Sequence, residues 1–130
     1  MILPSSPILV QTLSTFCSSV AQADVLRLDT IHPIVSGNKW YKLKYLLQDA
    51  ITQNKNTIAT FGGAFSNHIV ATAFACKAMQ LKSIGIIRGE QTKKLSHTLQ
   101  QAVDNGMQLV FVSREQYRQK KILYNNLITI

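Results

Sequence analysis

A lysine lies in line with the apolar stripe of a predicted helix, where its amine could do covalent chemistry. The spacing of apolar residues predicts a helix over residues 38–53, and the stripe consists of Leu43, Leu46, Leu47, Ala50 and Ile51. One turn earlier the same stripe reaches Lys39. Because burying an ammonium group is costly, two interpretations stay open. Either Lys39 extends to water from the helix start, or it is kept neutral for chemistry such as a Schiff base.

A second group of polar side chains follows a pair of glycines in the stretch FGGAFSNH, residues 61–68. Gly62 and Gly63 join a predicted strand to a helix predicted over residues 66–80. The free N–H groups and positive dipole end of that helix, together with Ser66 and Asn67, could hold a carboxylate or a phosphate. The alternative is a tight turn in which serine or asparagine only caps the helix. The loop is neither a GxGxxG motif nor a P-loop.

The elements that must position these residues alternate between strand and helix after residue 57. Strands are predicted over 57–61, 83–87 and 108–112, and helices over 66–80, 96–105 and from Ser113 onward. Gly106 is the natural residue to follow the second of these helices, and Ser113 begins a capping box with Gln116. This order predicts an α/β fold, with a parallel sheet flanked by helices on both faces. The loops 62–67 and 88–90 and Ser113 should then share the carboxyl edge of the sheet, where ligands gather.

The N-terminal part is less regular. Residues 1–22 are predicted as an irregular lead, and residues 24–29 as a half-exposed strand. A loop containing Pro33 and Gly37 precedes the lysine-bearing helix.

Composition restricts the classes of function. The 130 residues fit one domain, and 46% of them are hydrophobic. The net charge of +8 suggests an anionic partner, either a nucleic acid, a phosphate-bearing ligand or an acidic protein surface. Basic residues are spread along the chain without aromatic interleaving, which favours a solvated basic surface over nucleic-acid binding. The absence of a signal peptide or membrane-length apolar run leads us to expect a cytoplasmic protein with no membrane partner.

Cysteine and histidine do not indicate a metal site or a disulfide framework. Cys17 and Cys76 are far apart, and His32, His68 and His97 lack ligand spacing. Cys76 lies in an apolar helical run and should be a buried small hydrophobe.

Four stretches occur in an order that resembles a known enzyme family. They are SGNKWYKLKYLL, FGGAFSNHIVATAFA, GIIRGE and GMQLVFVSREQYRQKK. The chain resembles the 1-aminocyclopropane-1-carboxylate deaminase and D-cysteine desulfhydrase family, whose members are pyridoxal 5′-phosphate enzymes of the tryptophan-synthase-β-like fold. The resemblance implies that the sheet corresponds to the small domain of that fold.

The resemblance also implies roles for individual residues. Lys39 maps to the Schiff-base lysine, Asn67 would bind the 3′-oxygen of the cofactor, and Lys42 would reach its phosphate. Lys39 and Ser66 would be the catalytic residues. The substrate would be bound by the residues of the glycine loop and the helix start, namely Gly63, Ser66, Asn67 and His68. Histidine after Ser-Asn is more similar to the desulfhydrase branch than to the deaminases.

The implied function is release of ammonia and a 2-oxo acid from a small amino acid of the D-cysteine or aminocyclopropane carboxylate type. Alternatives are an inactive remnant, half of a split enzyme or, from another class, a small basic nucleic-acid-binding domain. Family members are considerably longer, so residues 1–36 would belong to their larger domain, and residues 37–121 would form the small α/β domain. Residues 122–130 are an atypical apolar tail, which suggests a truncated chain. Self-association or a missing second domain is therefore expected.

Overall fold

A three-stranded parallel sheet forms the centre of the computed structural model, which describes residues 7–13 and 23–119. The strands are β3 (Thr57–Gly62), β4 (Lys82–Arg88) and β5 (Met107–Val112), in the order β3-β4-β5. Each crossover contains one helix, α2 (Asn67–Ala78) and then α3 (His97–Asp104). The predicted alternation of strands and helices is therefore confirmed. Its physical basis is that parallel neighbours need a long connection, which a helix supplies.

The strand register brings the three predicted loops to one edge. Gly62 pairs with Ile87, and Arg88 pairs with Val112, so the carboxyl ends of the strands are level. The N–H of Gly89 donates to the carbonyl oxygen of Val112 over 2.8 Å and ties two of these loops together.

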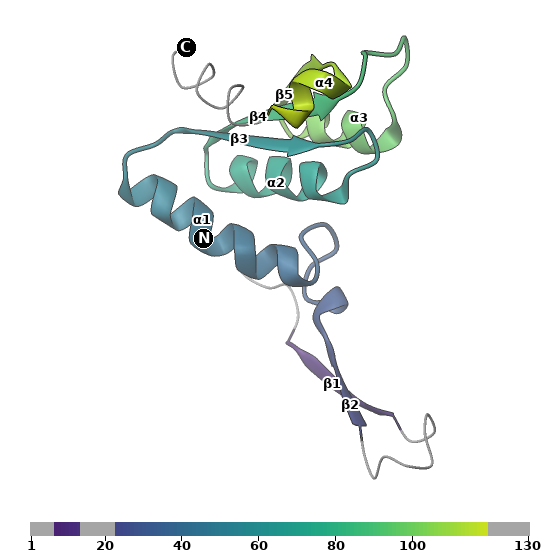
Figure 1. Ribbon diagram of the computed structural model, residues 1–130. Coiled ribbons are helices and arrows are strands. Elements are labelled where there is room, and N and C mark those ends of the chain that lie inside the picture. The colour runs from purple at the N-terminus through teal and green to yellow at the C-terminus, as the bar shows by residue number, and fades with distance from the viewer. Residues whose placement is uncertain (1–6, 14–22, 120–130) are drawn as a thin grey trace.

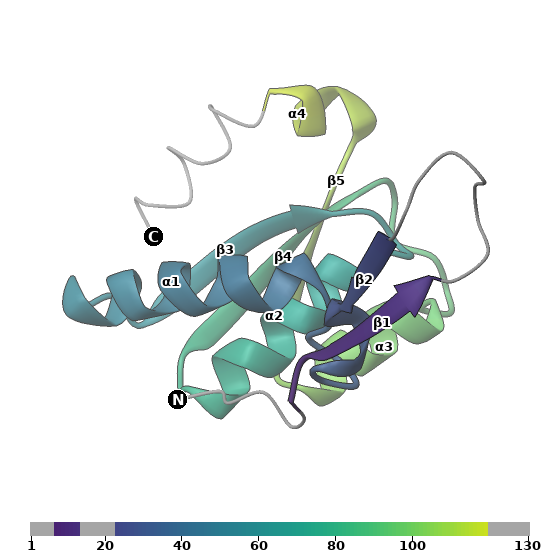
Figure 2. The same cartoon turned by 90° about the horizontal axis from the view of Figure 1, so that it is seen from below.

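The helices are divided unequally between the two sides of the sheet. Helix α1 (Asn38–Thr52), α2 and α3 lie on one side, and the five-residue helix α4 (Arg114–Arg118) lies on the other (Figure 1 and Figure 2). Helices were predicted on both faces of the sheet. Within the described ranges, one face is covered by three helices and the other by the short helix α4 alone.

Helix α2 is buried almost all round, as its alanine-rich sequence predicts. One side packs with α1 and the loop before it, in a cluster formed by Ile31, Val35, Trp40, Leu43, Leu47, Ala71, Ala75 and Cys76. Its other side packs with α3 and the sheet, in a cluster formed by Ile69, Ala73, Ile87, Leu99, Ala102 and Met107. Helix α2 therefore connects the two halves of the core.

The buried stripe of α1 differs from the prediction. Trp40, Leu43 and Leu47 are buried, whereas Leu46 is 64% exposed and Ile51 is 44% exposed. The apolar residues of this helix cover more than one face, and the small side chains of α2 accept only the face that carries Trp40. The Trp40 indole lies edge-on to the Tyr41 ring, with centroids 5.0 Å apart.

The helix ends follow local sequence signals. The Ser96 hydroxyl caps α3 by accepting from the N–H of Leu99, and Gly106 follows that helix with φ of +84°. Ser113 and Gln116 form the predicted capping box at the start of α4.

The N-terminal part contains a strand that was predicted to be irregular. Strand β1 (Leu9–Leu13) pairs antiparallel with β2 (Ala23–Arg27), and a short 3₁₀ turn, η1 (Leu28–Thr30), follows. This pair lies apart from the main sheet (Figure 1). Most side chains of β1 are exposed, so its sequence has no clear alternation between buried and exposed positions. Pairing with β2, which is distant in sequence, defines the strand.

The part of the chain that the structure describes contains neither a membrane-length helix nor a cluster of metal-binding side chains. No helix there is long and apolar enough to cross a membrane. No group of three or more histidine, cysteine or acidic side chains there is arranged to hold a metal ion.

Cys76 offers a test of this core. It is fully buried, and burial raises the pKa of its thiol to about 11. Because the thiolate is the reactive form, Cys76 should remain unlabelled by iodoacetamide at about pH 8 in the folded protein and react in denaturant. Peptide mass spectrometry measures the modification. Rapid labelling of Cys76 in native buffer would contradict the packing of α2 against α1.

Candidate functional site

The loop between β3 and α2 depends on one close contact. Gly62 is buried, and a Cβ atom there would lie 2.4 Å from Cγ1 and 2.7 Å from Cδ1 of the Ile69 side chain. At Gly63, by contrast, a Cβ atom would meet nothing within 4 Å. The first glycine therefore permits α2 to approach β3, whereas the second lies in open space beside the helix start.

Ser66 occupies the N-cap position of α2 but does not act as a side-chain cap. Its backbone is extended, and its hydroxyl makes no capping hydrogen bond with the helix. Ser66 therefore lacks the side-chain hydrogen bond that defines an ordinary serine cap. Asn67 and His68 follow in the first turn, where backbone N–H groups lack helical acceptors. This end of α2 presents donors near the carboxyl end of β3.

The first two turns of α1 bring two lysines, Lys39 and Lys42, toward the same place. Gly37, with φ of +64°, precedes the helix, and its N–H donates to the carbonyl oxygen of Leu28 over 2.7 Å. Lys39 is half-buried and Lys42 is exposed. Burial, followed by the charges of Lys39 and Lys42, holds the pKa of His68 below its ordinary value of 6.5. Lys39, Lys42 and His68 thus interact electrostatically although they come from different helices.

A threonine that the sequence analysis missed supports His68. Nε2 of His68 lies 2.9 Å from Oγ1 of Thr60, which belongs to β3. Thr60 shares the helix-facing side of β3 with Ile58 and Gly62, because alternate residues of a strand face the same way. The position of Thr60, two residues before Gly62 in the predicted strand, is the sequence signal that could have placed it beside α2. We call Lys39, Lys42, Thr60, Ser66, Asn67 and His68 the lysine–histidine site.

The other described histidines have different surroundings. His32 is buried, and its Nδ1 accepts from the N–H groups of Ile34 and Val35 over 3.1 Å and 3.0 Å. It therefore shapes the loop that precedes α1. His97, exposed at the start of α3, lies beside its neighbour Thr98.

The chain is similar to known proteins in both sequence and structure. No family model matches the chain. A protein of Thermotoga maritima named a putative 1-aminocyclopropane-1-carboxylate deaminase is 38% identical over 93 residues, which cover 72% of this chain and 30% of that protein. The bifunctional D-cysteine desulfhydrase/1-aminocyclopropane-1-carboxylate deaminase of Arabidopsis thaliana is 44% identical over 54 residues, covering 42% of this chain and 14% of that protein.

A solved structure described as an ACC deaminase homologue superimposes with a TM-score of 0.69 and 27% identity, over 85% of this chain and 34% of that one. The chain therefore has the α/β fold of part of that structure. It is a partial relative of the 1-aminocyclopropane-1-carboxylate deaminase and D-cysteine desulfhydrase family. It spans about 30% of the length of the Thermotoga protein and 14% of the Arabidopsis one over the matched residues.

The two glycines of the loop should respond differently to alanine. Gly62→Ala places a methyl group against the fully buried Ile69 and should lower the free energy of unfolding by about 1–3 kcal/mol. Gly63→Ala is the matched control and should change it by less than about 0.5 kcal/mol. Urea denaturation measures both values. Equal effects of the two substitutions would contradict the described approach of α2 to β3.

The electrostatic link between the helices can be measured by NMR titration of His68. Replacing Lys39 and Lys42 together by methionine removes two positive charges, so the pKa of His68 should rise toward 6.5. His68 stays half-buried in this variant, so its pKa should remain somewhat below 6.5. Lys55→Met, far from the site, should leave the titration unchanged. An unaltered His68 pKa in the double variant would show that the two helices are not arranged as described.

Proposed function

We propose that this chain supplies the lysine and the serine–asparagine loop of a pyridoxal-phosphate-dependent deaminase or desulfhydrase that acts on a small amino acid. The observation that carries the proposal is the convergence of Lys39 and Lys42 from α1 with His68 from α2. Ser66 and Asn67 immediately precede His68 at the same helix end. The names of the relatives support the reaction class.

The chemistry of these donors fits the cofactor. Lys39 offers a half-buried primary amine for the aldehyde carbon, Lys42 offers a cation for the phosphate, and Asn67 offers an amide for the ring oxygen. Pyridoxal phosphate would supply an electron sink for charge that develops at the substrate α-carbon. The Ser66 hydroxyl, which makes no helix cap, is left to interact with substrate.

The residues of this chain would bind the substrate and move its proton. The N–H groups at the start of α2 suit the substrate carboxylate, which the helix dipole also favours. In a desulfhydrase, Nζ of Lys39 would take the α-proton while the thiol leaves from the β-carbon. His68, held neutral by burial and by the neighbouring lysines, adds a polar group without adding a positive charge. Uptake of water would then give ammonia and a 2-oxo acid, with sulfide as the third product when D-cysteine is the substrate.

The activity is proposed for this chain together with the residues that complete the site. The matched region is 30% of the Thermotoga protein, so the remaining contacts would come from a second domain or from another chain. Association of this chain with a second copy belongs to the same proposal. An inactive remnant of the family is the alternative that an experiment must separate.

The test is absorbance spectroscopy of the purified protein with pyridoxal phosphate, followed by borohydride reduction and peptide mass spectrometry. We expect a visible band and a reduced adduct on Lys39, with both lost in Lys39→Ala and both retained in Lys55→Ala. Release of ammonia and a 2-oxo acid from D-cysteine or aminocyclopropane carboxylate would then be assayed. Adducts spread evenly over exposed lysines, with no preference for Lys39, would identify the chain as a remnant without the cofactor chemistry.

A further inference from the structure

Three arginines surround a cavity that the proposed function does not use. Arg88 ends β4, and Arg114 and Arg118 belong to α4. With Tyr117 they line a cavity of about 300 Å³. Arg88 is the last residue of β4, so the cavity lies at the carboxyl edge of the sheet. Its other lining residues belong to α4, which lies on the other side of the sheet from α1, α2 and α3 (Figure 1). We call Arg88, Arg114, Tyr117 and Arg118 the arginine cluster.

An aromatic contact orients Arg88, and helix spacing places Arg114 and Arg118 on one face of α4. The Arg88 guanidinium lies 5.8 Å from the centroid of the Tyr117 ring, within the range of a cation–π interaction. Phe61 of β3 meets the same ring edge-on, with centroids 5.7 Å apart. Arg114 and Arg118 are four residues apart on α4, so they share one helix face. The Tyr117 ring thus orients Arg88, and Arg114 and Arg118 line the same cavity from one face of α4.

None of the three arginines of the cluster forms an ion pair with another described residue. The ion pair found among the described residues joins Arg27 and Asp29 in the N-terminal part. Glu90 lines a neighbouring cavity with Arg88, and Glu115 belongs to α4 itself, but neither forms an ion pair with the cluster. Arg114 and Arg118 are like charges at the i, i+4 spacing, which is unfavourable, and an anion in the cavity would relieve this repulsion.

We propose that the arginine cluster binds the phosphate group of a small phosphomonoester. Such a group carries a charge of about −1.5 to −2 and three acceptor oxygens, which match several guanidinium forks better than a single carboxylate does. The cavity volume is at the lower end of the range for small-molecule sites. Its position follows the rule that ligands of parallel sheets bind beyond the carboxyl ends of the strands.

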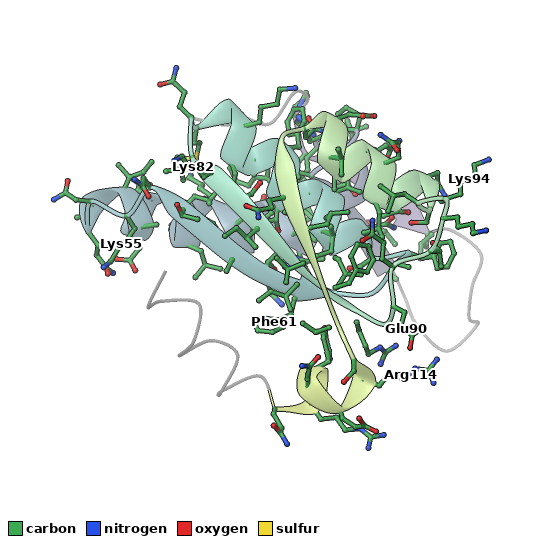
Figure 3. The ribbon with its side chains drawn as sticks, turned by 90° about the horizontal axis from the view of Figure 1, so that it is seen from above. Lys55, Phe61, Lys82, Glu90, Lys94 and Arg114 are labelled. Carbon is green, nitrogen blue, oxygen red and sulfur yellow. The ribbon has the colours of Figure 1, made fainter. Side chains whose placement is uncertain are left out.

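Phenyl phosphate is the probe, and isothermal titration calorimetry at constant ionic strength is the measurement. Arg114→Gln with Arg118→Gln should weaken binding by at least about tenfold, because each lost charged hydrogen bond is costly. The matched control is Lys55→Gln with Lys82→Gln, which removes the same charge from exposed side chains at the other end of the strands (Figure 3). This control should change the affinity by less than about twofold.

A second variant separates shape from charge. Arg114→Lys with Arg118→Lys keeps both charges but loses the guanidinium forks, so its affinity should lie between those of the native protein and the glutamine variant. Circular dichroism checks that each variant is folded. Equal loss of affinity in the Lys55 and Lys82 control would overturn the proposal. So would tight binding of a single-stranded oligonucleotide without saturable binding of phenyl phosphate.

Discussion

The contact between α2 and β3 at Gly62 and Ile69 determines how close the buried helix lies to the sheet. Both hydrophobic clusters contain residues of α2, so its position sets the position of α1 on one side and of α3 on the other. The first turn of α2 also carries Asn67 and His68. Any displacement of this helix would therefore alter the core and the lysine–histidine site together. Small residues on α2 are what allow this dense arrangement, since larger side chains would separate the layers.

Elements defined by local signals were predictable from the sequence, whereas those defined by distant partners were not. The capping box at Ser113 and the glycine after α3 act within a few residues, so their outcome matches the prediction. Strand β1 and the buried face of α1 depend on packing partners elsewhere in the chain. The site shows the same division. His68 could be selected from its motif, but its contact with Thr60 requires knowing that β3 and α2 lie side by side.

Positive charge is used differently on the two sides of the sheet. In the lysine–histidine site, burial and two lysines keep the pKa of His68 low, and the other basic groups are primary amines. Amines can form covalent bonds and exchange protons. In the arginine cluster, an aromatic ring orients the Arg88 guanidinium group, and Arg114 and Arg118 share one helix face. Guanidinium groups stay charged and recognise anions by shape. The composition alone, with its net charge of +8, cannot distinguish these two uses.

Trp40 is an intrinsic fluorescent probe of the packing of α1. The chain contains one tryptophan, next to Lys39, and its ring is only 6% exposed. Its indole Nε1 is buried without a hydrogen-bond partner in the described ranges, and Nζ of Lys44 lies 5.1 Å from the ring centroid. Emission from so dry an environment is displaced to short wavelength and shifts when water reaches the ring. Fluorescence therefore follows undocking of α1 without any label, and an absorbing group bound at the adjacent lysine would quench it by energy transfer.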